Sequence, residues 1–412
     1  MNLLSGINQR LRSDVFGRFE RRIWILTVIQ LFTSAGFSIC LPFLALYLYQ
    51  ERGLPMTFIG TIFLIAGLCS AVTHIIGGVL TDRLGRRRVL LGVTAVSIFM
   101  YGGLAALIGL SAPIWAIVVV YITARSVLTT IRPAISAMVA DLAPPERLTE
   151  TYGLLRVGGN VGFAAGPALG GYLMTFIPYA WLFGVTTLTW ALSFVLIFFL
   201  LRESYRVSSE QVTFRSLISV AGDRRFLMFT GLSALVFLTM AQFGSTLSVF
   251  TVDRLGFSTA QYGLLLTING LLVATFQYPV ARSVNRLERS TGLILGSILY
   301  ALGYLSLGWV GSFGWGVAVM VIITAGEIVF APLTPTVVAE LSPEDKRGRY
   351  MGFLGLGQTL GMSFGPLVGG VLLDTFETKP PFIWGIIASV AFVAALGFYR
   401  WGATRQINRN SI

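Results

Sequence analysis

Three charged residues within the long apolar segments of this sequence have side chains that can exchange a proton or hold an anion. Glu327 is the one acid that lies well inside such a segment, and Arg125 and Arg132 lie seven residues apart in another. Seven residues make about two helical turns, so both arginines are expected on one face of a helix. An ionisable group inside a membrane span costs about 2.5–3.5 kcal/mol on insertion scales, so all three are functional candidates.

Five uncharged polar residues in these segments are further candidates for lining an aqueous cavity: Gln30, His74, Gln242, Asn269 and Gln358. Each could equally join neighbouring helices through a hydrogen bond, a common use of polar side chains in membranes. His74 is the only histidine of the chain, which excludes a metal site built from several histidines. A single histidine in a helix is more often a hydrogen-bonded packing residue than a proton relay.

The composition shows which elements must carry these residues. Of 412 residues, 55% are hydrophobic and 12% charged, whereas a soluble domain is about 25% charged. Apolar runs of about 20 residues are long enough to cross roughly 30 Å of hydrocarbon. We therefore predict an all-α integral membrane protein with twelve transmembrane helices. They are expected at 23–49, 57–80, 89–110, 115–141, 150–175, 180–201, 226–252, 258–281, 290–310, 314–340, 349–373 and 381–399.

The net charge of +12 follows the predicted topology. With the N-terminus in the cytoplasm, 24 of the 30 Lys and Arg residues fall on the cytoplasmic side and 3 on the other. This asymmetry is the positive-inside signal, and it predicts that both termini are cytoplasmic. The basic residues are thus explained without nucleic acid. The two cysteines, Cys40 and Cys69, lie in predicted helices and indicate neither a disulfide framework nor a metal site.

An internal repeat predicts two related halves. The spacing G-x8-G-x3-G-P-x2-G-G occurs in the fifth predicted helix and again, 199 residues later, in the eleventh. Its members are Gly153, Gly162, Gly166, Pro167, Gly170 and Gly171 in the first copy, and Gly352, Gly361, Gly365, Pro366, Gly369 and Gly370 in the second. Earlier in each half the shift is 203 residues. Small residues at this spacing let helix backbones approach closely, which is the structural alternative to any functional interpretation.

The predicted organisation follows from this duplication. A cytoplasmic segment at 1–22 precedes a six-helix bundle at 23–201, a cytoplasmic linker at 202–225, a second six-helix bundle at 226–399 and a cytoplasmic tail at 400–412. Six is an even number, so both bundles enter the membrane in the same direction and a substrate path is expected between them. The repeat aligns Glu327 with Leu128, between the two arginines. Glu327 is therefore expected across a central cavity from them, either as a proton carrier or as a fixed ion-pair partner.

The loop after the second predicted helix carries four basic residues, one acid and two glycines. It resembles the G-x-L-a-D-r-x-G-r-k loop of the major facilitator superfamily, and the resemblance covers residues 23 to about 400. The matching positions include Gly78, Asp82, Arg83, Gly85, Arg86 and Arg87. The resemblance implies that Asp82 latches the two halves near the start of the eleventh helix, with an arginine of the loop beside it. The second half has Asn285 in place of this acid.

The glycine signature of the fifth helix resembles the motif of the drug:proton antiporters in this superfamily. We therefore predict a secondary transporter, a proton-coupled exporter of small amphiphilic molecules or drugs that works by alternating access. A proton symporter or facilitator for a polar or anionic metabolite, and a lipid or lysolipid transporter, are the alternatives. The arginine pair favours an anion because guanidinium groups bind carboxylate and phosphate well.

Other classes of function fit the sequence poorly. A membrane enzyme needs a cluster of His, Asp, Glu or Cys, and a receptor or scaffold does not need two gated halves. The expected partners are a small-molecule substrate and the lipid bilayer of the cell membrane, the inner or plasma membrane. We expect a monomer without cofactor, metal or nucleic acid, whose coupling ion is the proton.

Overall fold

The chain folds into long helices. The structure is a computed structural model and describes residues 19–204, 219–284, 286–343 and 346–410, and within these ranges the chain contains no strand. The predicted N-terminal segment at 1–22, the linker at 202–225 and the tail at 400–412 therefore lie partly outside the described residues, and Asn285 lies outside them entirely.

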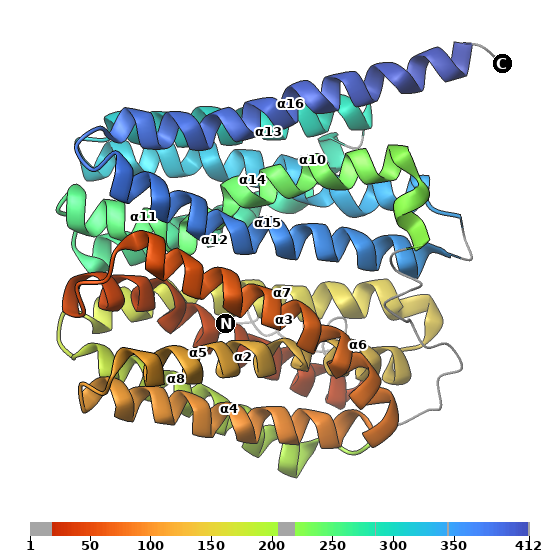
Figure 1. Cartoon of the computed structure of the whole chain (residues 1–412). Coiled ribbons are helices and arrows are strands. Elements are labelled where there is room, and N and C mark those ends of the chain that lie inside the picture. Colours follow the sequence, from red (N-terminus) through yellow and green to blue (C-terminus); the bar gives the residue numbers. More distant parts are fainter. Residues whose placement is uncertain (1–18, 205–218, 285, 344–345, 411–412) are drawn as a thin grey trace, which may run out of the picture.

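The first group of helices runs from Arg21 to Leu200. It comprises α2 (Arg21–Leu46) with its π-helical extension η2 (Tyr47–Glu51), α3 (Met56–Leu84), α4 (Arg86–Gly109), α5 (Ile114–Thr129), α6 (Ile131–Leu142), α7 (Leu148–Leu173) and α8 (Tyr179–Leu200). The second group comprises α10 (Arg224–Met240), η5 (Ala241–Gly244), α11 (Thr246–Val249), η6 (Phe250–Arg254), α12 (Thr259–Val284), α13 (Arg289–Ser306), η7 (Leu307–Trp309), α14 (Phe313–Leu341), α15 (Arg347–Thr375) and α16 (Pro380–Asn410). Figure 1 shows the two groups as two facing bundles.

Eleven helical segments of the described chain are long and apolar enough to cross a membrane. The predicted fifth helix at 150–175 is present as the 26-residue helix α7, but it is not among the eleven. Its many glycines and polar residues lower its hydropathy. The predicted fourth helix at 115–141 is divided at Thr130 into α5 and α6. Pro133 explains this break, because it cannot donate the helical hydrogen bond to the carbonyl four residues before it.

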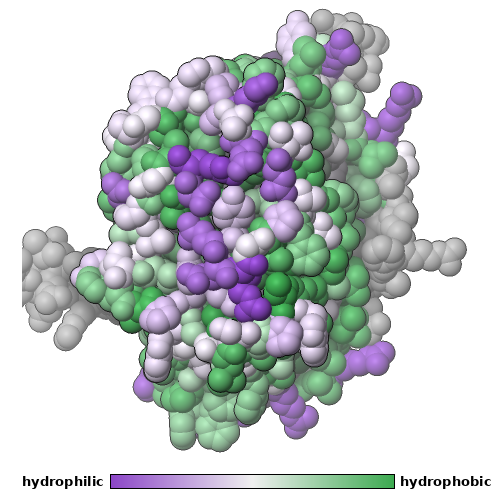
Figure 2. All heavy atoms as spheres, turned by 60° about the vertical axis from the view of Figure 1, so that its left-hand side comes forward, coloured by the Kyte–Doolittle hydropathy of each residue, from purple (hydrophilic) through white to green (hydrophobic). Residues whose placement is uncertain are grey.

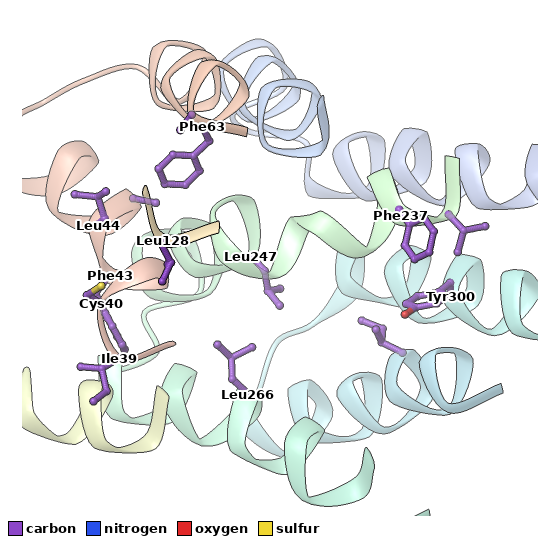
Figure 3. Packing of buried hydrophobic residues seen from close by; sticks show 14 of the residues in the cluster. Ile39, Cys40, Phe43, Leu44, Phe63, Leu128, Phe237, Leu247, Leu266 and Tyr300 are labelled. Carbon is purple, nitrogen blue, oxygen red and sulfur yellow. The ribbon is translucent and has the colours of Figure 1, made fainter. Parts of the chain in front are cut away.

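Helices within each group pack mainly on one another. In the first group α2 packs on α7 and α8, and α4 packs on α8; in the second, α13 packs on α14 and α16, and α10 packs on α15. The groups meet where α3 lies along α15 and α7 lies along α12. Figure 3 shows buried hydrophobic side chains of both groups, including Phe43 and Leu44 in α2 and Phe237 in α10.

One ion pair occurs at equivalent places in both groups. Arg86 Nε lies 2.9 Å from a carboxylate oxygen of Asp141, and Arg289 Nε lies 2.8 Å from one of Glu340. The shifts of 203 and 199 residues that align the sequence repeat also align these two pairs. The duplication therefore extends from the sequence to specific side-chain contacts.

The glycine signature lies where helices cross at close range. A Cβ atom at Gly162 would collide with Leu31 O in α2, and one at Gly361 would collide with Ala234 O in α10. Similar collisions would follow at Gly166, Gly170, Gly365 and Gly369. Gly153, in contrast, has no atom within 4 Å of the position of a Cβ. Most of the signature is therefore required by packing, whichever solute the protein handles.

The last glycine of each copy touches the opposite group. A Cβ at Gly171 would collide with Thr259 O of α12, and one at Gly370 would collide with Met56 O of α3. Both contacts lie at the end of the molecule that is on the left in Figure 1. Figure 2 turns this side forward and shows hydrophilic residues in a band with hydrophobic residues on its flanks.

Candidate functional site

A cavity of about 310 Å³ lies within the first group of helices, between α2, α6 and α7. It is lined by Gln30, Ser34, Arg132, Ile135, Ser136, Tyr152, Leu155, Arg156, Gly159, Asn160 and Phe163. Two of these residues carry a guanidinium group, and none of the described lining residues carries a carboxylate. The cavity wall is therefore positively charged and rich in hydrogen-bond donors.

Glu327 of α14 is held by a short polar network. Its carboxylate accepts a hydrogen bond from Asn269 Nδ2 at 2.9 Å, and the same amide donates to Thr324 Oγ1 at 3.0 Å. Asn269 is 6% exposed, so α12 and α14 enclose this side of the network. The charge of Arg156, on α7, acts on the Glu327 carboxylate. An acid of the second group and a cavity arginine of the first are thus electrostatically linked.

The two arginines of the predicted fourth helix have different surroundings. Arg132 lies in α6 and lines the cavity. Arg125 lies in α5, outside the cavity lining, and its guanidinium stacks over the Phe37 ring at 4.7 Å. The turn at Thr130 lies between them, but Thr130 keeps a helical backbone, with φ of −68° and ψ of −20°, so the expectation that both arginines lie on one helical face stays a prediction. The arginine that acts on Glu327 is Arg156, which the alignment of the halves did not single out.

The uncharged candidates divide into cavity residues and residues that join helices. Gln30 lines the cavity and donates to Ser34 Oγ at 3.2 Å, while Gln358 is exposed on α15. Gln242 is fully buried; it donates to Leu238 O and Gly365 O, each at 3.0 Å, and accepts from Thr246 Oγ1 at 2.6 Å. These bonds use its amide fully and tie η5 to α15, so it contributes to packing.

Two polar lining residues were not identified from the sequence, namely Ser136 and Tyr152. Arg156 was recognisable as a charge near the start of the fifth predicted helix. Its role depends on the orientation of α7, which is set by the glycine contacts with α2. The sequence therefore shows the charge of Arg156, but it does not show that this side chain lines the cavity.

The loop between α3 and α4 forms a network within the first group. Asp82 lies 3.7 Å from Arg86, and the Arg86 side chain, only 4% exposed, also pairs with Asp141. Gly78 has open space around it, and Arg83 is exposed. Asp82 thus pairs inside its own group in this conformation, and its predicted contact with the eleventh helix stays a prediction.

Glu203 is a member of this network that the sequence did not reveal. Its carboxylate accepts hydrogen bonds from the backbone N–H groups of Arg86 and Arg87, at 2.9 and 3.2 Å, where α4 begins. A carboxylate at this position stabilises a helix N-terminus. Gly85 makes the approach possible, because its φ is +94° and a Cβ there would lie 2.7 Å from Glu203. Arg87 additionally donates to Leu201 O at 2.8 Å.

At the other ends of the helices, an acid of the second group binds the N-terminus of a helix of the first group. Asp374, at the end of α15, accepts hydrogen bonds from Met56 N at 3.0 Å and Thr57 N at 2.7 Å, at the start of α3. Arg254 donates to Tyr49 Oη at 3.1 Å across the same boundary. The close contacts between the groups extend inward from this end as far as Gly67 on α3 and Gly270 on α12.

Comparison with known proteins gives a consistent family relationship. A family model described as Major Facilitator Superfamily matches residues 26–262 and 232–411. An uncharacterised MFS-type transporter of Bacillus subtilis, YttB, is 26% identical over 369 residues, covering 87% of this chain and 90% of that protein. Multidrug resistance protein MdtH of Salmonella typhimurium is 23% identical over 380 residues, covering 90% and 92%.

Solved structures of transporters have the same fold. A nucleoside transporter, NupG, has a TM-score of 0.79 at 12% identity, covering 92% of this chain and 99% of that one. A POT family transporter in complex with 5-aminolevulinic acid has a TM-score of 0.75 at 16% identity, covering 91% and 95%. These likenesses establish the fold of the chain; the solutes in their titles belong to those proteins.

Proposed function

The chain belongs to the major facilitator superfamily and is a membrane transporter, not an enzyme, and from this premise we propose that it exports small amphiphilic molecules or drugs in exchange for protons. Alternating access between two bundles would carry the exchange. The name of the MdtH relative supports multidrug export as the direction to test first.

We place the protein in the cell membrane with both termini in the cytoplasm. We also count α7 as a membrane span, which brings the eleven apolar segments to twelve spans. The length of α7 and its position between α2 and α12 support its assignment as a span. We propose that the two packed groups of helices form the bundles at 23–201 and 226–399. The asymmetric distribution of Lys and Arg supports the orientation. In this orientation the α3–α15 and α7–α12 contacts lie on the extracellular side. We therefore infer that the conformation described here is closed to the extracellular side.

The observation that supports the proposal is the position of the Glu327 carboxylate, which lies within the membrane-spanning helix α14 and accepts a hydrogen bond from Asn269 of α12. A carboxylate at the boundary of two bundles can release its proton on one side of the membrane and bind one on the other. When Glu327 is charged it attracts Arg156, and when it is protonated this attraction is lost. Proton binding therefore changes the interaction between the bundles, which is the requirement for coupling to alternating access.

A second candidate is transport of a polar or anionic metabolite by symport or facilitation. The specific observation in its favour is the pair of guanidinium groups of Arg132 and Arg156 in one cavity. Guanidinium forks bind carboxylate and phosphate through paired hydrogen bonds. A lipid or lysolipid carries a phosphate too, so it belongs to the same chemical alternative. We propose that the transporter acts as a monomer with a small-molecule substrate and requires no cofactor or metal.

Purified protein in liposomes with an imposed pH gradient tests these proposals. Antiport predicts that ethidium, a lipophilic cation, accumulates when the lumen is acidic. Symport of an anion predicts instead that carboxyfluorescein accumulates when the outside is acidic. Glu327→Gln should abolish gradient-driven accumulation and leave exchange without a gradient intact, while Glu150→Gln, at an exposed acid of α7, should behave as the wild type. Unchanged coupling in Glu327→Gln would exclude this carboxylate as the proton carrier.

A further inference from the structure

Two prolines create the same gap in the two helices that carry Arg132 and Glu327. Pro133 lies in α6 and Pro332 in α14, 199 residues apart, at equivalent places in the repeat. Proline has no backbone N–H, so the carbonyl four residues earlier loses its donor within the helix. The two carbonyls concerned belong to Thr129 and Ile328.

A side chain from a neighbouring helix reaches each of these carbonyls. His74 Nδ1, on α3, lies 3.2 Å from Thr129 O, and Gln277 Nε2, on α12, donates to Ile328 O at 3.2 Å. The shift of 203 residues that aligns the early part of the two halves maps position 74 onto position 277. The same bond is thus made twice, by residues of different type at equivalent positions.

Each of the two bonds lies beside a charged residue of the candidate site. Arg132, three residues after Thr129, lines the cavity from the first turn of α6. Glu327 directly precedes Ile328 and makes the network with Asn269. A change in the direction of either helix at its proline would therefore move one of these charged groups.

We propose that His74 and Gln277 are positioning residues, which hold the two proline-opened helices in the direction that brings Arg132 to the cavity and Glu327 to its contact with Asn269. A backbone carbonyl left without a donor in a membrane protein is costly, and neighbouring helices commonly supply one. The hydroxyl of Thr73 supports the same junction by donating to Ser126 O at 2.7 Å. Together these bonds fasten α3 to the end of α5.

This role requires an N–H donor and no proton exchange. A carbonyl oxygen only accepts hydrogen bonds, so Nδ1 of His74 carries the hydrogen and Nε2 does not in the neutral side chain. Glutamine serves the same purpose in the second half, although it cannot titrate. His74 is therefore a donor to the backbone, in place of the proton relay that a lone histidine in a transporter suggests.

Nuclear magnetic resonance can test the assigned tautomer because His74 is the only histidine. Protein labelled with ¹⁵N-histidine and purified through a histidine-free tag gives the signals of this one ring. At about pH 9, where histidine side chains are neutral, we expect the hydrogen on Nδ1 and a bare Nε2. In Pro133→Ala the restored N–H can occupy Thr129 O, and the preference for Nδ1–H should weaken. A ring protonated on Nε2 in the wild type would overturn the proposal.

Thermal unfolding of matched variants tests the bond itself. His74→Leu removes the donor at similar size, and His74→Gln copies the second half. We expect His74→Leu to lower the Tm, His74→Gln to restore most of the loss, and His74→Leu to cost much less in a Pro133→Ala background. Equal Tm values for His74→Leu and His74→Gln would contradict the proposal, and this comparison stands even where Pro133→Ala does not fold.

The consequence for transport rests on the proposed function and has a separate readout. His74→Leu and Gln277→Leu should each raise the KM for ethidium about fivefold, the effect expected from loss of one hydrogen bond, with a smaller change in kcat. His74→Gln should restore the wild-type KM. A KM that His74→Gln fails to restore would exclude a positioning role. Absence of ethidium transport by the wild type would instead count against the proposed function, and the tautomer would still test the bond.

Discussion

The carboxylate of Asp374 is expected to hold the extracellular side of the transporter closed. It accepts two backbone hydrogen bonds at the start of α3 from its place at the end of α15, and so joins the two groups of helices. Opening to the outside separates α3 from α15 and must break both bonds. Asp374→Asn keeps the shape but removes the charge and one of the two acceptors, whereas Asp374→Ala removes both acceptors.

The size of the effect follows from the two components of the contact. A carboxylate at a helix N-terminus contributes about 0.3–1 kcal/mol when exposed and up to about 2 kcal/mol when partly buried. One to two kcal/mol changes a two-state ratio by roughly 5–30-fold. We therefore expect Asp374→Asn to raise the ratio of outward-open to outward-closed protein by up to about fivefold, and Asp374→Ala by roughly 5–30-fold.

Distances between spin labels measure this ratio directly. In a background with both cysteines replaced, one pair of labels at Leu110 and Trp309 reports on the extracellular ends, where these side chains are 80% and 62% exposed. A second pair at Leu84 and Leu287 reports on the opposite ends, where they are 49% and 42% exposed. Asp374→Ala should lengthen the first distance and shorten the second.

A matched control separates the hydrogen bonds from a general effect of charge. Glu51 is an exposed carboxylate at the same end of the molecule, and Glu51→Gln should leave both distance distributions unchanged. An unchanged extracellular distance in Asp374→Ala would refute the reasoning. The same lengthening in Glu51→Gln would also refute it, because the effect would then be one of net charge.

Three further outcomes are expected. Gly370→Ala places a Cβ against backbone at the α3 contact, so the same labels should show loss of extracellular closure, whereas Gly153→Ala, with nothing within 4 Å, should show none. Arg86→Ala leaves the Asp141 carboxylate without its buried partner and should destabilise the protein by about 3–5 kcal/mol, seen as a lower Tm. Arg156→Gln should weaken binding of carboxyfluorescein about tenfold, the value of one charge-assisted hydrogen bond, as measured by fluorescence anisotropy.

The spans and the duplication were predictable because both produce patterns that can be recognised in the sequence, namely apolar runs and a repeated glycine spacing. Apolar runs predict spans by length alone, and all but one of the predicted regions contain a helix that meets this criterion. The exception is α7, whose many glycines lower its hydropathy. Its recognisable feature is the glycine spacing that lets it pack closely against α2. The repeat aligns Arg86 with Arg289 and Asp141 with Glu340, but the contact within each pair was not predicted and is a finding of the structure.

The candidate site was less predictable because it depends on helix rotation and on contacts between distant residues. Arg132 lines the cavity whereas Arg125 stacks over the Phe37 ring, a difference that the sequence pattern did not indicate. Asp374 and Met56 are 318 residues apart, so their contact had no local signal. Gln242 is polar like a cavity residue, yet its amide donates to the backbone carbonyls of Leu238 and Gly365 and so joins helices.

The differences between the halves are more informative about function than their similarity. Each half has a proline that opens a carbonyl and a neighbouring side chain that donates to it, which makes this bond a shared architectural feature. Next to that shared bond the first half places Arg132 and the second half places Glu327. A symmetric scaffold thus presents a cation from one side and an acid from the other. In the proposed alternating-access cycle the two bundles move as units, so the separation of these opposite charges would change, and protonation of Glu327 is the chemical step that we propose biases that change.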